Sequence, residues 1–312
     1  MMVVRSGNAI RQTTLETAWG WAVAAVVAWT ATWFTVQCAG ITSDAFADHA
    51  WYACAVLSLC PPMAVLGSRR PGTRVWMWFI LFPMLMALAW PLLAVRLQGS
   101  ELRQVQLELP QLLAFSFVLV MGVGNYVGTR FTFAALLYGA AVISSVISMS
   151  QVAPYWLLDR LQVRLWCSAA MAVSIGLSQL SRRPTHHSRF DQLWVEFFDL
   201  FGIVWGRRIQ DRVNHIAQKE SWPVRLGFEG FVLVEPVASS DMVLHERGTP
   251  TGGPLDQFRS RSIQVGADPA LLEARIEQTF RWLLRRFVDP PWINSRLGAV
   301  ATSLPAREEI DS

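Results

Sequence analysis

The chain has 312 residues, of which 53% are hydrophobic and only 16% are charged, and its formal net charge is +4. Soluble domains carry about 25% charged residues, so this composition excludes an ordinary soluble domain over the whole length. The 15 tryptophans and 17 phenylalanines exclude a disordered chain. All the excess positive charge lies in residues 1–181, among the apolar segments, which predicts control of membrane topology and no nucleic-acid partner.

Six segments of the first 181 residues are long and apolar enough, or nearly so, to cross a bilayer, which takes about 20 residues in a helix. They cover residues 17–39, 45–67, 74–95, 109–128, 131–150 and 161–180. The first apolar stretch exceeds the 7–15 residues of a signal-peptide core, so we expect an uncleaved anchor. The sequence therefore predicts an all-α polytopic bundle of six transmembrane helices over residues 1–181, with the lipid bilayer as its solvent.

The charges between these segments predict the orientation of the chain. One set of connecting segments is purely basic and contains Arg5, Arg11, Arg69, Arg70, Arg74, Arg130, Arg182, Arg183 and Arg189. The alternate set is acidic or mixed and contains Asp44, Asp48, Arg96, Glu101, Arg103, Glu108, Asp159, Arg160 and Arg164. Because cytoplasmic loops are enriched in arginine and lysine, both termini are expected in the cytoplasm, with the bundle in the inner (cytoplasmic) membrane.

Two features inside the segments bear on packing and on a solute path. Gly124 and Gly128 form a GxxxG pattern, which permits close approach of helices and makes them candidate helix-packing residues. Four prolines, which remove backbone donors and kink helices, are candidate kink or cavity residues: Pro61, Pro62, Pro83 and Pro91. Broken helices either line a transporter cavity or hold a static shape with neighbours capping the freed carbonyls.

The segments carry no ionisable residue at mid-depth, which disfavours an ion-coupled carrier and an intramembrane hydrolase. The four cysteines, Cys38, Cys54, Cys60 and Cys167, show no metal-ligand spacing with one another or with histidine. The sequence therefore predicts no catalytic residue, no cofactor and no metal site.

Residues 182–312 have an ordinary charged fraction and predict a small, mainly helical α+β cytoplasmic domain. Helical spacing of apolar residues predicts helices over about 190–218 and 269–288. Period-two alternation predicts a strand or hairpin over 222–236, while the composition of 237–267 predicts a flexible loop. After Asp289 two prolines stop the second helix, and the remaining end is expected to be loose.

An aromatic stripe on the first of these helices is too apolar to face water. It consists of Trp194, Phe197, Phe198, Phe201 and Trp205. Three covers remain open: the rest of the tail, a partner protein or second copy in a helix-in-groove mode, and the membrane surface. The stripe is a candidate partner-binding face for a protein partner or a homodimer.

The pattern FDQLW…FG..W..R joined to WPVRL, between Phe190 and Phe231, resembles a pattern of polytopic membrane proteins from planctomycete-type bacteria. That resemblance implies no activity and no site residues.

Three function classes fit these features. The sequence favours an integral membrane scaffold or complex subunit whose tail docks a partner or a second copy. The alternative is a transporter or permease for a neutral or amphipathic solute, with a path beside the proline-broken second and third segments. An enzyme at the cytoplasmic face, using Asp211, His215 and Glu220, lacks a nucleophile or a metal spacing to support it.

Overall fold

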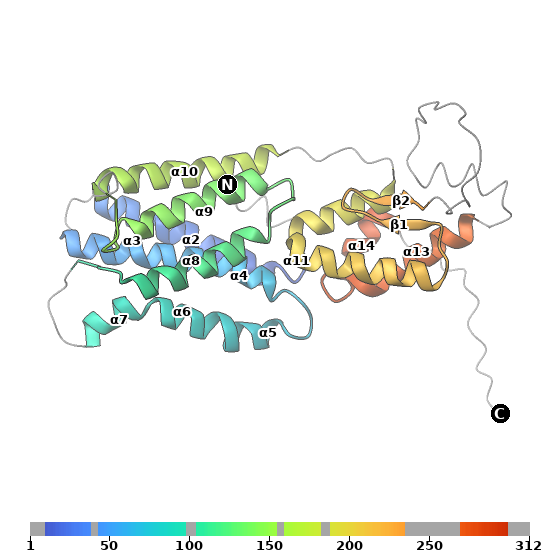
Figure 1. The fold of residues 1–312 in the computed structure, drawn as a ribbon, viewed down its shortest axis with the longest axis horizontal. Coiled ribbons are helices and arrows are strands. Elements are labelled where there is room, and N and C mark those ends of the chain that lie inside the picture. The colour runs from blue at the N-terminus through green and yellow to red at the C-terminus, as the bar shows by residue number, and fades with distance from the viewer. Residues whose placement is uncertain are drawn as a thin grey trace, which may run out of the picture.

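Helices make up most of the computed structural model, which describes residues 10–38, 43–97, 104–154, 159–181, 188–234 and 269–298. The expected loop 237–267 and the end of the chain from residue 299 lie outside these ranges. The helices form two groups placed end to end (Figure 1). We call residues 10–181 the bundle, and residues 188–234 and 269–298 the C-terminal cap.

The bundle helices are antiparallel rods with several breaks. Their bounds are α2 Glu16–Trp33 with its π-helical extension η1 Phe34–Cys38, α3 Asp44–Ser58, α4 Cys60–Leu66, α5 Thr73–Trp76, η2 Met77–Leu81, α6 Phe82–Leu88, α7 Trp90–Leu97, α8 Leu109–Gly124, α9 Thr132–Ile147 and α10 Arg160–Leu180. Among the described residues, three helices are long and apolar enough to cross a membrane: Glu16–Val36, Asp44–Leu66 and Arg160–Leu180. The shorter apolar helices are Thr73–Leu88, Leu109–Gly124 and Thr132–Ile147.

The outer surface of the bundle is apolar over most of its helices. Large exposed side chains on it include Phe34, Trp78, Phe79, Phe117, Val120, Phe133, Trp166 and Leu180. A soluble monomer rarely exposes so much contiguous apolar surface, because its hydration is unfavourable. This surface is compatible with a hydrocarbon environment.

Prolines break the bundle helices, and tyrosine hydroxyls cap the freed carbonyls. Pro83 and Pro91 lie in the first turns of α6 and α7. The carbonyl of Leu88, the last residue of α6, accepts from the Tyr52 hydroxyl at 2.7 Å, because the Leu92 N–H bonds to the Ala89 carbonyl instead. A buried carbonyl without a hydrogen-bond partner destabilises the fold, and this hydrogen bond removes that penalty at the break.

The GxxxG pair does not form the predicted helix contact within the chain. A Cβ atom built on Gly124 or Gly128 would meet no atom within 4 Å. Gly128 instead takes a φ of +82° in the turn between α8 and α9. Close packing occurs at Gly122, where the added Cβ would lie 2.9 Å from Pro62, and at Gly139 against Val123. Within the described residues the close contact of α8 therefore lies at Gly122 and not at the GxxxG pair.

The cap consists of helix α11 (Arg189–Lys219), a two-stranded hairpin, and two further helices, α13 (Pro269–Leu284) and α14 (Pro290–Leu297). Strands β1 (Val224–Leu226) and β2 (Phe231–Leu233) are antiparallel, with Arg225 opposite Val232. The short helix α14 replaces the loose end expected after Asp289, because its two prolines occupy a first turn, where no donor is needed.

Helix α11 is not the single straight helix that the sequence predicts. Gly202 has φ 76° and ψ −176°, and the chain reverses there into two limbs, 189–201 and 203–219. The two limbs lie beside each other, and their turn faces the bundle (Figure 1). Only glycine ordinarily adopts this backbone conformation.

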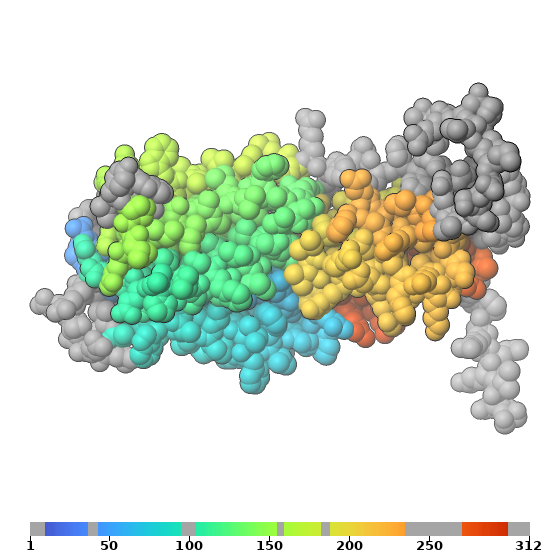
Figure 2. Space-filling model, viewed as in Figure 1, coloured from blue at the N-terminus to red at the C-terminus, as the bar shows by residue number. Residues whose placement is uncertain are grey.

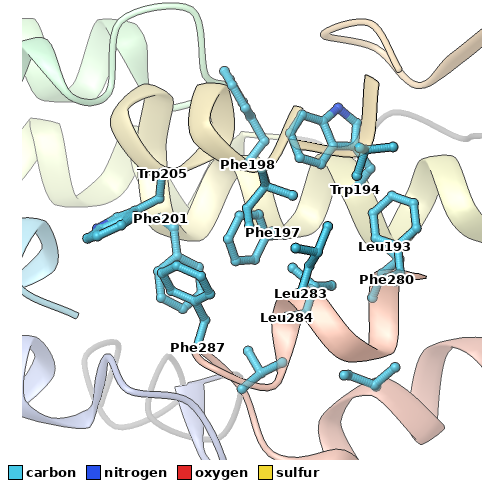
Figure 3. Close-up of a cluster of buried hydrophobic side chains, with 14 of the residues drawn as sticks. Leu193, Trp194, Phe197, Phe198, Phe201, Trp205, Phe280, Leu283, Leu284 and Phe287 are labelled. Atoms are coloured by element: carbon cyan, nitrogen blue, oxygen red, sulfur yellow. The ribbon is translucent and has the colours of Figure 1, made fainter. Parts of the chain in front are cut away.

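The aromatic stripe of α11 lies inside the cap. Trp194, Phe197 and Phe201 are fully buried, and Phe198 and Trp205 are 5% and 6% exposed. Phe287, which follows α13, makes edge-to-face contacts with Phe197, Phe201 and Trp205 (Figure 3). The predicted partner-binding face is thus corrected to an internal core, because α13 supplies the second apolar face that covers it.

Asn125 joins the bundle to the cap at the α11 turn. Its side-chain amide donates to the Phe201 carbonyl at 3.1 Å and accepts from the Val204 N–H at 3.0 Å. Its backbone carbonyl accepts from the Ile203 N–H at 2.7 Å. Asn125 is 1% exposed, so these bonds satisfy the backbone groups that the break at Gly202 frees. We call this set the Asn125 clamp.

Further contacts extend this seam between the two groups of helices. The Thr14 N–H donates to the Phe287 carbonyl at 2.8 Å, and the Arg70 N–H donates to the Arg286 carbonyl at 2.9 Å. The Trp205 indole N–H reaches the Val65 carbonyl at 3.2 Å. The cap atoms lie directly against the end of the bundle (Figure 2).

At the opposite end of the bundle, the carboxylate of Asp48 on α3 is paired with Arg160 and Arg164 of α10. Asp48 is 1% exposed and Arg164 is 7% exposed. Sequence analysis placed these residues in separate loops, because 112 and 116 positions separate them from Asp48. The three charges fix the start of α10 on α3.

Substitution Gly202→Ala is expected to destabilise the protein by about 1–3 kcal/mol, because alanine is strained at this backbone conformation and its methyl group would collide with Asn125. Gly176→Ala in α10, where a Cβ meets nothing within 4 Å, is the matched control. It is expected to be neutral or stabilising, since alanine favours helix. Thermal unfolding of both variants in detergent measures the difference, and equal melting temperatures would contradict the assigned turn.

Substitution Asp48→Asn is expected to cost about 3–5 kcal/mol, because it leaves the buried arginines without their counter-charge. Asp44→Asn, at the exposed start of the same helix, is the control and is expected to cost less than about 1 kcal/mol. Chemical unfolding of both variants in the same detergent provides the comparison. Similar losses would show that Asp48 does not hold the arginines.

Candidate functional site

A cavity of about 640 Å³ lies where the bundle meets the cap. Residues of α2, α4, α8, α9 and α10 form its walls, and Asp199 and Leu200 of the cap line one end. Small-molecule sites typically have volumes of about 300–1,000 Å³. The cavity is therefore the right size for one ligand.

Small side chains explain why the helices leave this space. The α2 wall presents alanines at helical spacing, and α9 presents two more: Ala18, Ala22, Ala25, Ala134 and Ala135. The rings of Pro61 and Pro62 complete the wall on α4, next to Gly122 of α8. The surface is mostly apolar, as expected for a site that holds an apolar body.

The Pro61–Pro62 break also organises the closed end of the cavity. Pro62 has no N–H, so the carbonyl of Ser58, four residues earlier, loses its helical partner. The hydroxyl of Tyr138, a cavity residue on α9, donates to this carbonyl. The Ser58 hydroxyl accepts from the Trp29 indole N–H at 2.8 Å. These bonds tie α2, α3 and α9 together beyond the cavity.

The cap end of the cavity is polar. The Arg130 guanidinium Nε lies 3.1 Å from Oδ2 of Asp199, and the Arg130 backbone N–H donates to Oδ1 at 3.2 Å. Ser178, Gln179 and Ser181, in and just after the last turn of α10, line the same end. Among the described lining residues, only Arg130 and Asp199 are charged at neutral pH, so the lining has no net charge.

Aromatic residues also line the cap end of the cavity. Trp19, Tyr126 and Phe131 all line the cavity, and each lies near the cap end of its helix. The Arg130 guanidinium lies 4.5 Å from the centroid of the Phe131 ring, a cation–π geometry. The polar end of the cavity therefore combines one cation, one anion and three ring systems.

The cavity is about one membrane leaflet deep. On α10 its lining extends from Met171 to Gln179, a rise of about 12 Å at about 1.5 Å per residue. The hydrocarbon core of a bilayer is about 30 Å thick. Beyond the cavity the bundle interior is filled by a second apolar cluster, which includes Trp29, Trp51, Leu59, Phe115 and Val142.

The structure brings together only part of the predicted site. Pro61 and Pro62 line the cavity, while Pro83 and Pro91 are not among its lining residues. Sequence analysis missed the Arg130–Asp199 pair, because 69 positions separate the two residues. Asp191 and Glu196, which precede Asp199 on the first limb of α11, are buried acids as well.

A signal for these buried acids was present in the sequence. Asp191, Glu196 and Asp199 have no lysine or arginine three or four positions away. All three are buried, and each binds another element. Asp191 accepts from the Phe231 N–H at 2.8 Å, and Glu196 holds Arg296 by two bonds of 2.6 and 2.8 Å.

No group of three or more His, Cys, Asp or Glu side chains suited to a metal ion occurs in the described part of the chain. Comparison with protein-family models, curated proteins and solved structures finds no match for this chain. Function is therefore inferred from the cavity itself.

Substitution Tyr138→Phe is expected to destabilise the protein by about 1–3 kcal/mol, because it leaves the buried Ser58 carbonyl without a donor. Tyr126→Phe is the control, since no hydrogen bond of the Tyr126 hydroxyl is recorded among the described residues. Melting temperatures of the two variants in detergent check the difference. A larger loss for Tyr126→Phe would contradict the capping role.

Proposed function

We propose that the protein is a polytopic membrane carrier for a neutral or amphipathic solute. The observation that supports this function is the cavity of about 640 Å³ beside the Pro61–Pro62 break, with an apolar wall and a polar end. In a transporter, broken helices next to a central cavity supply the site and the elements that move. The second apolar cluster fills the bundle beyond the cavity, so the cavity does not extend to the far end of the bundle.

We further propose that the bundle crosses the inner membrane six times and that both termini lie in the cytoplasm. Support comes from the connecting segments at the cap end, which carry Arg11, the group Arg69, Arg70 and Arg74, and Arg130. The far end carries Asp44 and Asp48, and Arg160 and Arg164 at that end pair with Asp48. Arginine excess on one side marks the cytoplasmic face.

A docking scaffold, the function that the sequence favours, has lost its main support. It needs an exposed aromatic face, and the five residues of the α11 aromatic stripe are buried in a core formed mainly by the cap. The carrier needs no such surface. A neutral or amphipathic solute also suits a wall without charge, because a charged solute would lose its hydration without compensation.

Substitution Ala22→Trp tests the carrier by filling the cavity. The full chain in lipid nanodiscs is exposed to a long-chain alcohol bearing a photoactivatable diazirine, and the labelled residues are mapped by mass spectrometry. The label is expected on cavity-lining residues of α2 and α10, and Ala22→Trp is expected to reduce it at least tenfold, because the indole occupies the ligand volume.

The matched control is Ala24→Trp on the exposed side of the same helix, which is expected to leave the cavity label unchanged. Labelling spread evenly over the outer surfaces of the bundle, and unaffected by Ala22→Trp, would refute the proposed function.

A further inference from the structure

The polar end of the cavity has features that select among amphipathic ligands. It presents one guanidinium, one carboxylate, an amide and hydroxyl groups around an otherwise apolar space. Asp199 is 4% exposed and Arg130 is held in its place by two contacts with Asp199, so both charges are fixed before a ligand arrives. Preorganised charges favour a headgroup with a matching charge pattern.

We propose, on the basis of the function proposed above, that the cavity holds a single-chain amphiphile with a zwitterionic ammonium–phosphate headgroup. The anionic group of the ligand lies toward Arg130 and the ammonium lies toward Asp199. The aromatic residues Trp19, Tyr126 and Phe131 surround the ammonium, because ring faces attract cations and form the usual cage for quaternary ammonium groups.

Charge balance favours this headgroup over the alternatives. A headgroup with one net charge would meet a lining whose charges already cancel, so part of its lost hydration would stay uncompensated. An uncharged headgroup forms hydrogen bonds with the polar groups of the lining but brings no charge to match that of Arg130 or Asp199. A zwitterion places each of its charges beside an opposite charge and leaves the site neutral.

The dimensions favour one chain. The lining spans a rise of about 12 Å on α10 and, from Leu15 to Val26, about 16 Å on α2, close to half of the hydrocarbon thickness of about 30 Å, so the apolar part accepts a chain from a single leaflet. A volume of about 640 Å³ lies in the range for small ligands rather than for a complete two-chain lipid. Ala18, Ala22 and Ala25 line the path of this chain.

The test uses the same nanodisc labelling, with three twelve-carbon competitors that differ in their headgroups. They are dodecylphosphocholine, dodecanoate and dodecyltrimethylammonium, each below its micelle-forming concentration. Dodecylphosphocholine is expected to displace the diazirine alcohol at a concentration at least tenfold lower than either charged competitor. Equal potency of the three competitors would overturn the headgroup assignment.

Variants of the ion pair test the cause of this preference. Asp199→Asn leaves a net positive site and is expected to improve competition by dodecanoate about tenfold, while Arg130→Gln is expected to favour dodecyltrimethylammonium. Asp211→Asn, in an exposed ion pair with Arg207 on the second limb of α11, is the control and is expected to change nothing. An unchanged ranking in a folded Asp199→Asn protein would also overturn the assignment.

The outcomes separate this inference from the carrier function. Labelling that depends on Ala22 but shows no headgroup preference leaves the carrier standing and removes the zwitterionic ligand. Labelling outside the cavity removes both. If Asp199→Asn fails to fold, the ranking of competitors on the unmodified protein still decides the inference.

Discussion

The Asn125 clamp is the contact on which the arrangement of bundle and cap depends. A glycine turn in α11 frees backbone groups on both sides, and one buried asparagine satisfies three of them. The same contact places the end of the first limb of α11 against the turn between α8 and α9. Asp199 therefore reaches Arg130, and the polar end of the cavity exists because the clamp is made.

Several buried polar groups acquire a partner from an element that is distant in the sequence. Tyr138 caps the carbonyl freed by Pro62, and Tyr52 caps a carbonyl freed at the break between α6 and α7. The acids of α11 bind groups of the bundle, the hairpin and α14. An unpaired polar group in an apolar interior costs about as much as several such bonds contribute, so these contacts select one packing. The cavity is stable for the same reason, because its closed end is hydrogen-bonded.

Some features could be predicted from the sequence because they depend on local chemistry. The apolar segments, the breaks at Pro61–Pro62 and the helices of the cap all follow from residue type and spacing. Local spacing failed where the chain reverses. Val224 and Leu226 are buried, and the same alternation continued along the chain would also bury Val232. The turn between the two strands shifts the alternation, so Val232 is exposed and Phe231 is buried.

By itself the sequence determined that residues 1–181 contain repeated apolar segments of about the length that crosses a bilayer. It also determined that α11 carries an aromatic face that must be covered. Only the tertiary structure decided what covers it, where the chain turns at Gly202, and which charges meet. The physical reason is that hydrophobicity and backbone propensity act over a few residues. Pairing of Asn125 with the α11 turn, or of Arg130 with Asp199, depends on groups about 70 to 80 positions apart being packed into one seam.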